Sequence, residues 1–172
     1  PIYQLFAPLK PVTLQPIIGS NASYPTFFRN KIRFAFINHE GKVWPSRHQK
    51  GSAKGDIPVD HCYLQSETAN TIIRAVAAFA EQHAWSIYNP DFGAGWFKHL
   101  LIREGKHTGE LMVVLITDQG ELQQKEAWLE MLKSAAPNLT AAYQCLGTGA
   151  NLFHLQDVHL WGDTHIHEQV GD

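Results

Sequence analysis

Residues 29–37 read RNKIRFAFI, and this stretch decides the fold because its side chains alternate in character. In an extended strand, successive side chains point to opposite faces. The cations Arg29, Lys31 and Arg33 then share one face, and the apolar residues that alternate with them share the other. The pattern predicts a strand that buries one face in a core and presents a row of cations on the other.

The basic character continues beyond this strand. Half of the lysines and arginines of the chain, 7 of 14, lie between Arg29 and Lys54, and Glu40 is the only acidic residue between those two positions. A local cationic patch on a chain with a net charge of −2 suggests a polyanionic ligand, above all nucleic acid. The alternative is a solvated face beside a flexible loop, which is the commoner case for patches of this size.

Length and composition narrow the class of protein. With 172 residues, 44% hydrophobic and 17% charged, the chain predicts one globular domain at 20–172 behind an extended, proline-rich lead-in at 1–19. Two distant cysteines make no disulfide scaffold, so a reducing, cytoplasmic compartment is expected. No apolar run reaches the roughly 18 residues of a membrane span, and no membrane association is expected.

Periodicity places the other elements. Residues 66–83 predict a helix, because Ser66 can cap it and apolar residues from Ala69 to Ala80 recur at helical spacing. Further strands are expected within 41–54 and at 96–103, 110–117, 139–145, 151–155 and 158–161, and a second helix at 122–135. The order β-β-α-β-β-α-β-β predicts an α+β fold, with a largely antiparallel sheet and two helices packed on one face.

Three segments in order resemble a known family. They are FRNKIRF at 28–34, VDHCYLQSE at 59–67, and WFKHLLIREG at 96–105 continued by TGELMV at 108–113. Together they resemble the central domain of the bacterial uracil-5-methyltransferases of 23S ribosomal RNA, over residues 16–171.

The resemblance implies a module of a larger enzyme. Such enzymes join an RNA-binding barrel, this central domain, and a methyltransferase domain that binds S-adenosylmethionine and supplies the nucleophilic cysteine and the base. No glycine-rich cofactor turn is found here, so this chain alone is expected to bind no cofactor and to be inactive. S-adenosylmethionine, the catalytic methyltransferase domain as a partner, and in many members a 4Fe-4S cluster then belong to the full-length parent.

The two cysteines have different expected roles. By the resemblance, Cys62 corresponds to the fourth ligand of that cluster, but the three other cysteines are absent from this chain. Cys62 is therefore a ligand in a longer parent, an orphan, or a small buried residue. Cys145, in an apolar strand without a partner base, is expected in the core.

The candidate RNA contacts combine cations with an aromatic residue. Trp44 is a candidate for stacking on an unpaired base, whereas Phe27 and Phe28, which also flank the basic stretch, are the kind of residue more often buried. On one strand, His99 and Arg103 share a face and Lys98 takes the other. The candidate RNA-binding residues are Arg29, Asn30, Lys31, Arg33, Trp44, Arg47, Lys50, Lys98, His99 and Arg103.

These observations lead to one functional hypothesis and several rivals. The chain is expected to be the substrate-gripping RNA-binding domain of an S-adenosylmethionine-dependent methyltransferase of ribosomal RNA, without its catalytic domain. The alternatives are a stand-alone RNA-binding protein and a homodimerising protein-interaction domain. A metal-dependent hydrolase is the least favoured, because His165 and His167 share a strand face but no further ligand completes a zinc pattern.

Overall fold

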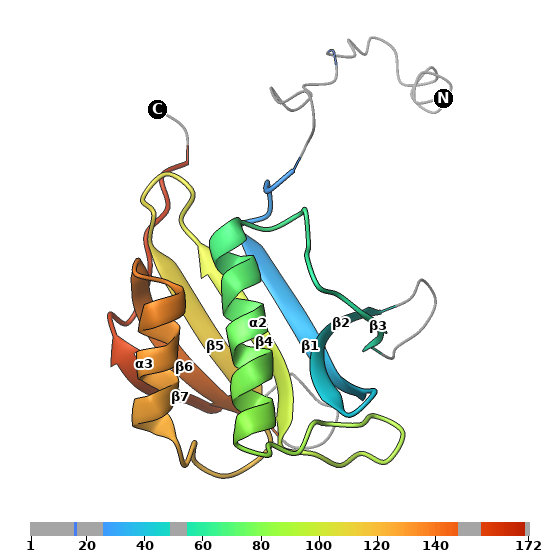
Figure 1. Ribbon diagram of the computed structural model, residues 1–172. Coiled ribbons are helices and arrows are strands. Elements are labelled where there is room, and N and C mark those ends of the chain that lie inside the picture. The colour runs from blue at the N-terminus through green and yellow to red at the C-terminus, as the bar shows by residue number, and fades with distance from the viewer. Residues whose placement is uncertain (1–15, 17–25, 49–54, 148–155, 171–172) are drawn as a thin grey trace, which may run out of the picture.

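The computed structural model describes residues 16, 26–48, 55–147 and 156–170. Within these residues, seven strands form one sheet in the order β3-β2-β1-β4-β5-β6-β7, and two helices cover one of its faces (Figure 1). The elements are β1 (Lys31–His39), β2 (Lys42–His48), β3 (Gly55–Pro58), α2 (Glu67–Gln82), β4 (Phe97–Glu104), β5 (Leu111–Thr117), α3 (Lys125–Ala135), β6 (Leu139–Leu146) and β7 (Gln156–Gly162).

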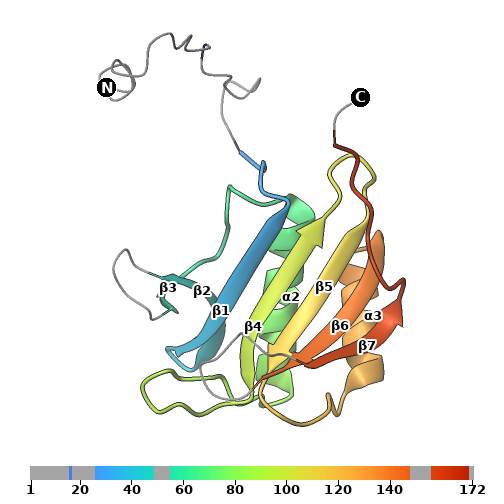
Figure 2. The same ribbon diagram turned by 180° about the vertical axis from the view of Figure 1, so that it is seen from behind.

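The sheet is antiparallel except at one pair. β5 and β6 run parallel, and α3 makes the crossover between them, whereas the other neighbours pair antiparallel. The predicted α+β class, with a largely antiparallel sheet and two helices on one face, is confirmed. The view from behind shows the other face of the sheet without a helix over it (Figure 2), and we name it the open face.

The core lies between the sheet and the helices. β1 follows the predicted alternation: Ile32, Phe34 and Phe36 are buried and belong to the main apolar cluster. The predicted apolar stripe of α2 is buried in the same cluster, as are Trp128, Leu129 and Leu132 of α3. Burial of this surface removes apolar area from water and is the main stabilising term of the fold.

The two helices begin in different ways. The Ser66 hydroxyl accepts a hydrogen bond from the backbone N–H of Ala69 (3.0 Å), so the predicted cap of α2 is confirmed. α3 begins at Lys125, three residues later than predicted, and its N-cap Gln124 makes no side-chain capping bond. Leu122 instead donates its backbone N–H to the side-chain oxygen of Gln144 (3.1 Å), and this bond holds it outside the helix.

The edge strand β3 and the two ends of the chain complete the comparison with the predicted elements. β3 was not predicted, because it is a four-residue edge strand with a glycine and a proline, and its ladder with β2 shifts register between Arg47 and His48. The predicted strand at 158–161 lies within β7. The predicted strand at 151–155 and the proline-rich lead-in, apart from Pro16, lie outside the described residues.

Candidate nucleic-acid interface

The cations of β1 stand on the open face. Lys31 and Arg33 are exposed while the residues between them enter the core, as the alternation predicts. Arg29 precedes the strand and is also exposed, and its backbone N–H donates to the carbonyl of Leu64 (2.9 Å). This backbone bond fixes the start of the cationic row next to the segment that leads into α2.

β4 brings further basic side chains to the same face. The register pairs Lys31 with Arg103, Arg33 with Leu101 and Ala35 with His99. Directly paired residues of an antiparallel ladder share a face, so Arg103 and His99 join the row. The sequence predicted that these two residues share a face with each other, and the pairing of β4 with β1 adds that this face is the one with Lys31 and Arg33. Two cations placed opposite each other, as Lys31 and Arg103 are, destabilise a sheet unless an anion lies between them.

We call Arg29, Lys31, Arg33, His99 and Arg103 the basic face. A concavity of about 420 Å³ opens on it. It is lined by Arg29, Lys31, Ile32, Arg33, Ala35, Ser46, Arg47, His99 and Leu101. Arg47 reaches it from β2: its guanidinium lies 4.8 Å from the centroid of the Phe34 ring and donates to the carbonyl oxygen of Arg33 (3.2 Å).

The arginines and the lysine of the basic face have no acidic partner in the part of the chain that the structure describes. Among the described residues, Arg29, Lys31, Arg33 and Arg103 form no ion pair with a carboxylate. Three other lysines do have acidic partners: Lys98 pairs with Asp118, Lys106 with Glu104, and Lys133 with Glu130. A row of four uncompensated cations is therefore available to an external polyanion.

Lys98 does not belong to this surface. It is 3% exposed, and its ammonium lies 3.5 Å from the Asp118 carboxylate and donates to the carbonyl of Gly147. The same ammonium lies 5.4 Å from the centroid of the Tyr88 ring. The sequence places Lys98 on the face opposite His99, but it gives no sign that a carboxylate and a carbonyl from distant segments bury the charge there.

The remaining candidate RNA contacts, Trp44, Asn30 and Lys50, differ in how accessible they are. Trp44 pairs with Ile37 in the β1–β2 ladder and is half-buried, so it is on the open face with only part of its ring accessible. Asn30 is exposed, and its carbonyl accepts the backbone N–H of Glu104 (2.8 Å). Lys50 lies outside the described residues.

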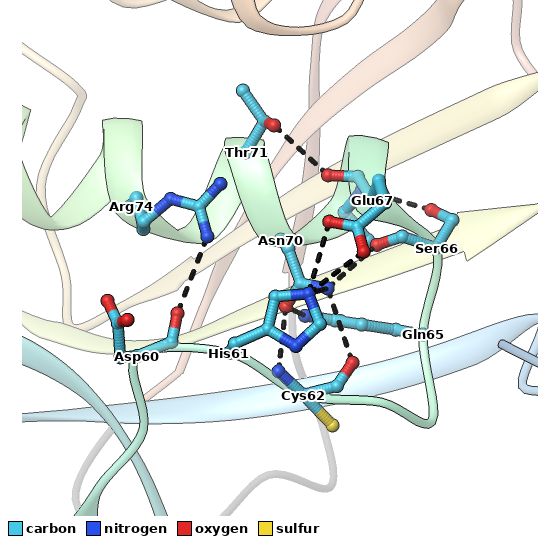
Figure 3. A network of polar contacts seen from close by, with 10 residues as sticks. Asp60, His61, Cys62, Gln65, Ser66, Glu67, Asn70, Thr71 and Arg74 are labelled. Atoms are coloured by element: carbon cyan, nitrogen blue, oxygen red, sulfur yellow. Dashed lines mark hydrogen bonds and ion pairs between the residues drawn. The ribbon is translucent and has the colours of Figure 1, made fainter. Parts of the chain in front are cut away.

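A polar cluster at the start of α2 holds the segment beside the basic face (Figure 3). The buried Asn70 side-chain oxygen accepts from the backbone N–H of Cys62 and from the side-chain amide of Gln65, both at 2.9 Å. Its amide group contacts Nε2 of His61 (3.2 Å), and that nitrogen also lies 2.9 Å from Glu67. The pattern around Ser66 predicted the helix cap but did not indicate that Asn70 organises the segment before it.

The described residues do not fit a metal or cluster site. Cys62 is 9% exposed and packs in the main apolar cluster. No group of three or more His, Cys, Asp or Glu side chains in the described ranges could hold a metal ion. His165 and His167 are neighbours, with ring centroids 4.8 Å apart, but His167 contacts Glu110 instead of completing a ligand set. Within the described residues, Cys62 is therefore a small core residue without the further ligands that a cluster needs.

A second set of polar contacts, which we call the C-terminal clasp, joins the C-terminal segment to the β4–β5 turn. The Glu168 carboxylate accepts the backbone N–H groups of Lys106 (2.6 Å) and His107 (3.1 Å), and these bonds lower the pKa of Glu168 to about 2. The Glu110 carboxylate accepts the backbone N–H of His167 (2.6 Å), which lowers the pKa of Glu110. The clasp brings the C-terminal segment to the end of the sheet where β1 begins (Figure 1).

Fold and surface together define an α+β domain with one face closed by helices and one open face that carries uncompensated cations. No family model matches the chain. Two curated relatives are similar over most of it. It is 32% identical over 163 residues to an uncharacterized RNA methyltransferase of Halalkalibacterium halodurans, which covers 94% of this chain and 35% of the relative. It is 28% identical over 173 residues to an uncharacterized RNA methyltransferase of Bacillus cereus, which covers 99% of this chain and 37% of the relative.

A solved structure has the same fold. The tRNA (uracil-54, C5)-methyltransferase of Pyrococcus abyssi, solved in complex with S-adenosyl-L-homocysteine, matches with a TM-score of 0.65 and 21% identity over 87% of this chain and 35% of that chain. This chain thus spans about a third of the length of the RNA methyltransferases that it resembles. Within its described residues, neither helix has the length and apolar character needed to cross a membrane.

Proposed function

We propose that this chain is the RNA-binding, substrate-gripping domain of an S-adenosylmethionine-dependent uracil-5-methyltransferase of ribosomal RNA. The basic face carries the proposal, because Arg29, Lys31, Arg33 and Arg103, which form no ion pair with a carboxylate of the described residues, lie on the side of the sheet that neither described helix covers. The names of the relatives, which are RNA methyltransferases, support RNA as the polyanion. The cofactor and the reacting groups then belong to a catalytic domain of the parent chain.

The basic face acts on the backbone of the RNA. Lys31, Arg33 and Arg103 bind phosphates and so fix the position of the strand, while contacts to bases provide specificity. An enzyme that modifies a base must take it out of the stack, and a firm hold on the flanking backbone helps to meet the energy of that step. Buried Lys98 takes no part in this binding.

The experiment replaces Arg29, Lys31 and Arg33 together with alanine and measures RNA affinity as a function of salt concentration. Each lost phosphate contact lowers the slope of log affinity against log salt by about 0.7 for single-stranded RNA, so the triple variant should lose about 2 units of slope. The matched control replaces Arg74, Lys125 and Lys133, which lie on the helices, with alanine. It removes the same charge from the other side of the protein. Equal slopes for the triple variant and the wild type would reject the proposal.

A further inference from the structure

An aromatic cluster stands at the start of β1, beside the basic face. The ring of His61 lies between Phe27 and Tyr63, with edge-to-face contacts at centroid distances of 6.4 and 4.6 Å. Tyr63 is 66% exposed and Phe27 is 37% exposed, so neither ring is used mainly for the core. We call these three residues the aromatic shelf.

The shelf is held in place by backbone bonds. Phe27 donates its N–H to the carbonyl of Tyr63 (2.7 Å), and Arg29 donates to the carbonyl of Leu64 (2.9 Å). Phe27 has a φ of +56°, a conformation that a bulky side chain rarely adopts and that persists only where the surroundings enforce it. His61 is fixed in turn by Glu67 and Asn70. Rings that are already ordered lose little conformational entropy when a ligand binds.

The position of the shelf relative to the cations indicates its ligand. Arg29 lies two residues from Phe27, and Lys31 and Arg103 continue the row of charge along the sheet. Aromatic rings beside a cationic track are the arrangement that binds single strands, because bases stack on the rings while phosphates lie on the cations. A duplex keeps the faces of its bases stacked inside and offers none to the rings, and an apolar protein partner would leave the cations unmatched.

We propose that the aromatic shelf stacks an unpaired base of an RNA strand whose neighbouring phosphates lie on the basic face. Tyr63, the most exposed ring of the three, makes the main contact. This inference rests on the proposed function and deepens it, because it specifies a single-stranded segment as the substrate.

The test compares Tyr63→Ala with Phe92→Ala in the full chain. Phe92 is a matched control, since it is 81% exposed but lies in the loop between α2 and β4 and makes no contact with the shelf. The probes are a single strand of about 12 nucleotides with 2-aminopurine near its centre, and a duplex of the same sequence. Anisotropy gives the affinity, and quenching of 2-aminopurine reports stacking.

Tyr63→Ala should lower the affinity for the single strand at least about fivefold and abolish the quenching, with duplex affinity and salt slope unchanged. Tyr63→Trp should restore both signals, and Phe92→Ala should behave as the wild type. If the wild type binds RNA with the expected salt slope and Tyr63→Ala binds equally well, the shelf proposal fails and the proposed function stands. If the wild type binds no RNA, both fail.

Discussion

Replacing Asn70 with alanine should destabilise the protein by about 1–5 kcal/mol. The side chain is 0% exposed, and its oxygen is the acceptor for the backbone N–H of Cys62 and the side-chain amide of Gln65. Both donors are buried and would be left without a partner, at about 1–3 kcal/mol each. The higher helix propensity of alanine offsets about 0.6 kcal/mol of this loss. The segment before α2, which carries His61, should loosen first.

Urea denaturation followed by circular dichroism measures the effect as a change in the free energy of unfolding. Thr71→Ala is the control on the next position of the helix, because Thr71 is exposed and its hydroxyl bonds only to the carbonyl of Glu67. That variant should stay within about 0.5 kcal/mol of the wild type. A loss below about 1 kcal/mol for Asn70→Ala, or equal losses in both variants, would refute the reasoning.

Three further outcomes follow from the contacts described. The pKa of Glu168 is lowered from 4.5 to about 2, so the stability that its hydrogen bonds contribute is complete above about pH 4.5 and is lost as the pH falls towards 2. The difference in melting temperature between the wild type and Glu168→Gln should therefore shrink over that interval. A difference that stays constant would contradict this role of Glu168. Burial, together with the hydrogen bond to Asp157, raises the pKa of the Cys145 thiol to about 12, so mass spectrometry should find this cysteine unalkylated by iodoacetamide at pH 7 in the folded protein and alkylated after unfolding. Lys98→Ala should cost about 1–3 kcal/mol in urea denaturation without changing the salt slope of RNA binding, whereas Arg103→Ala should lower the slope at little cost in stability; the reverse pattern would overturn the placement of the two cations.

The fold could be predicted wherever a local pattern matched the environment of an element. The alternation in β1, the capped amphipathic start of α2 and the apolar run of β5 each depend on neighbours in sequence, and each is confirmed. The start of α3 was misjudged because a hydrogen bond from Leu122 to Gln144 competes with the helix, and that partner is 22 residues away. β3 gave no usable signal, since it is a short edge strand.

The sequence predicted the cations on β1, but it did not predict the contacts that position the residues around them. Face sharing by Lys31 and Arg33 follows from the period of a strand, whereas Arg103 joins them through the pairing of β1 with β4, which the sequence did not predict. The burial of Lys98 beside Asp118 and the C-terminal clasp bring together groups 20 or more residues apart, so no local pattern announces them. The aromatic shelf was not predicted: Trp44 was the candidate for stacking and Tyr63 appeared only within the segment 59–67, because no local pattern places Tyr63 beside Phe27.

The alternation in β1 also separates two kinds of selection on one strand. Side chains that hold the fold together point to the helices, and the exposed cations Lys31 and Arg33 point away from them. Substitutions on opposite faces share few contacts, so their effects on stability should be nearly additive with one another. The charge pattern of the open face can therefore be altered, by evolution or by an engineer, one residue at a time while the core sequence stays untouched.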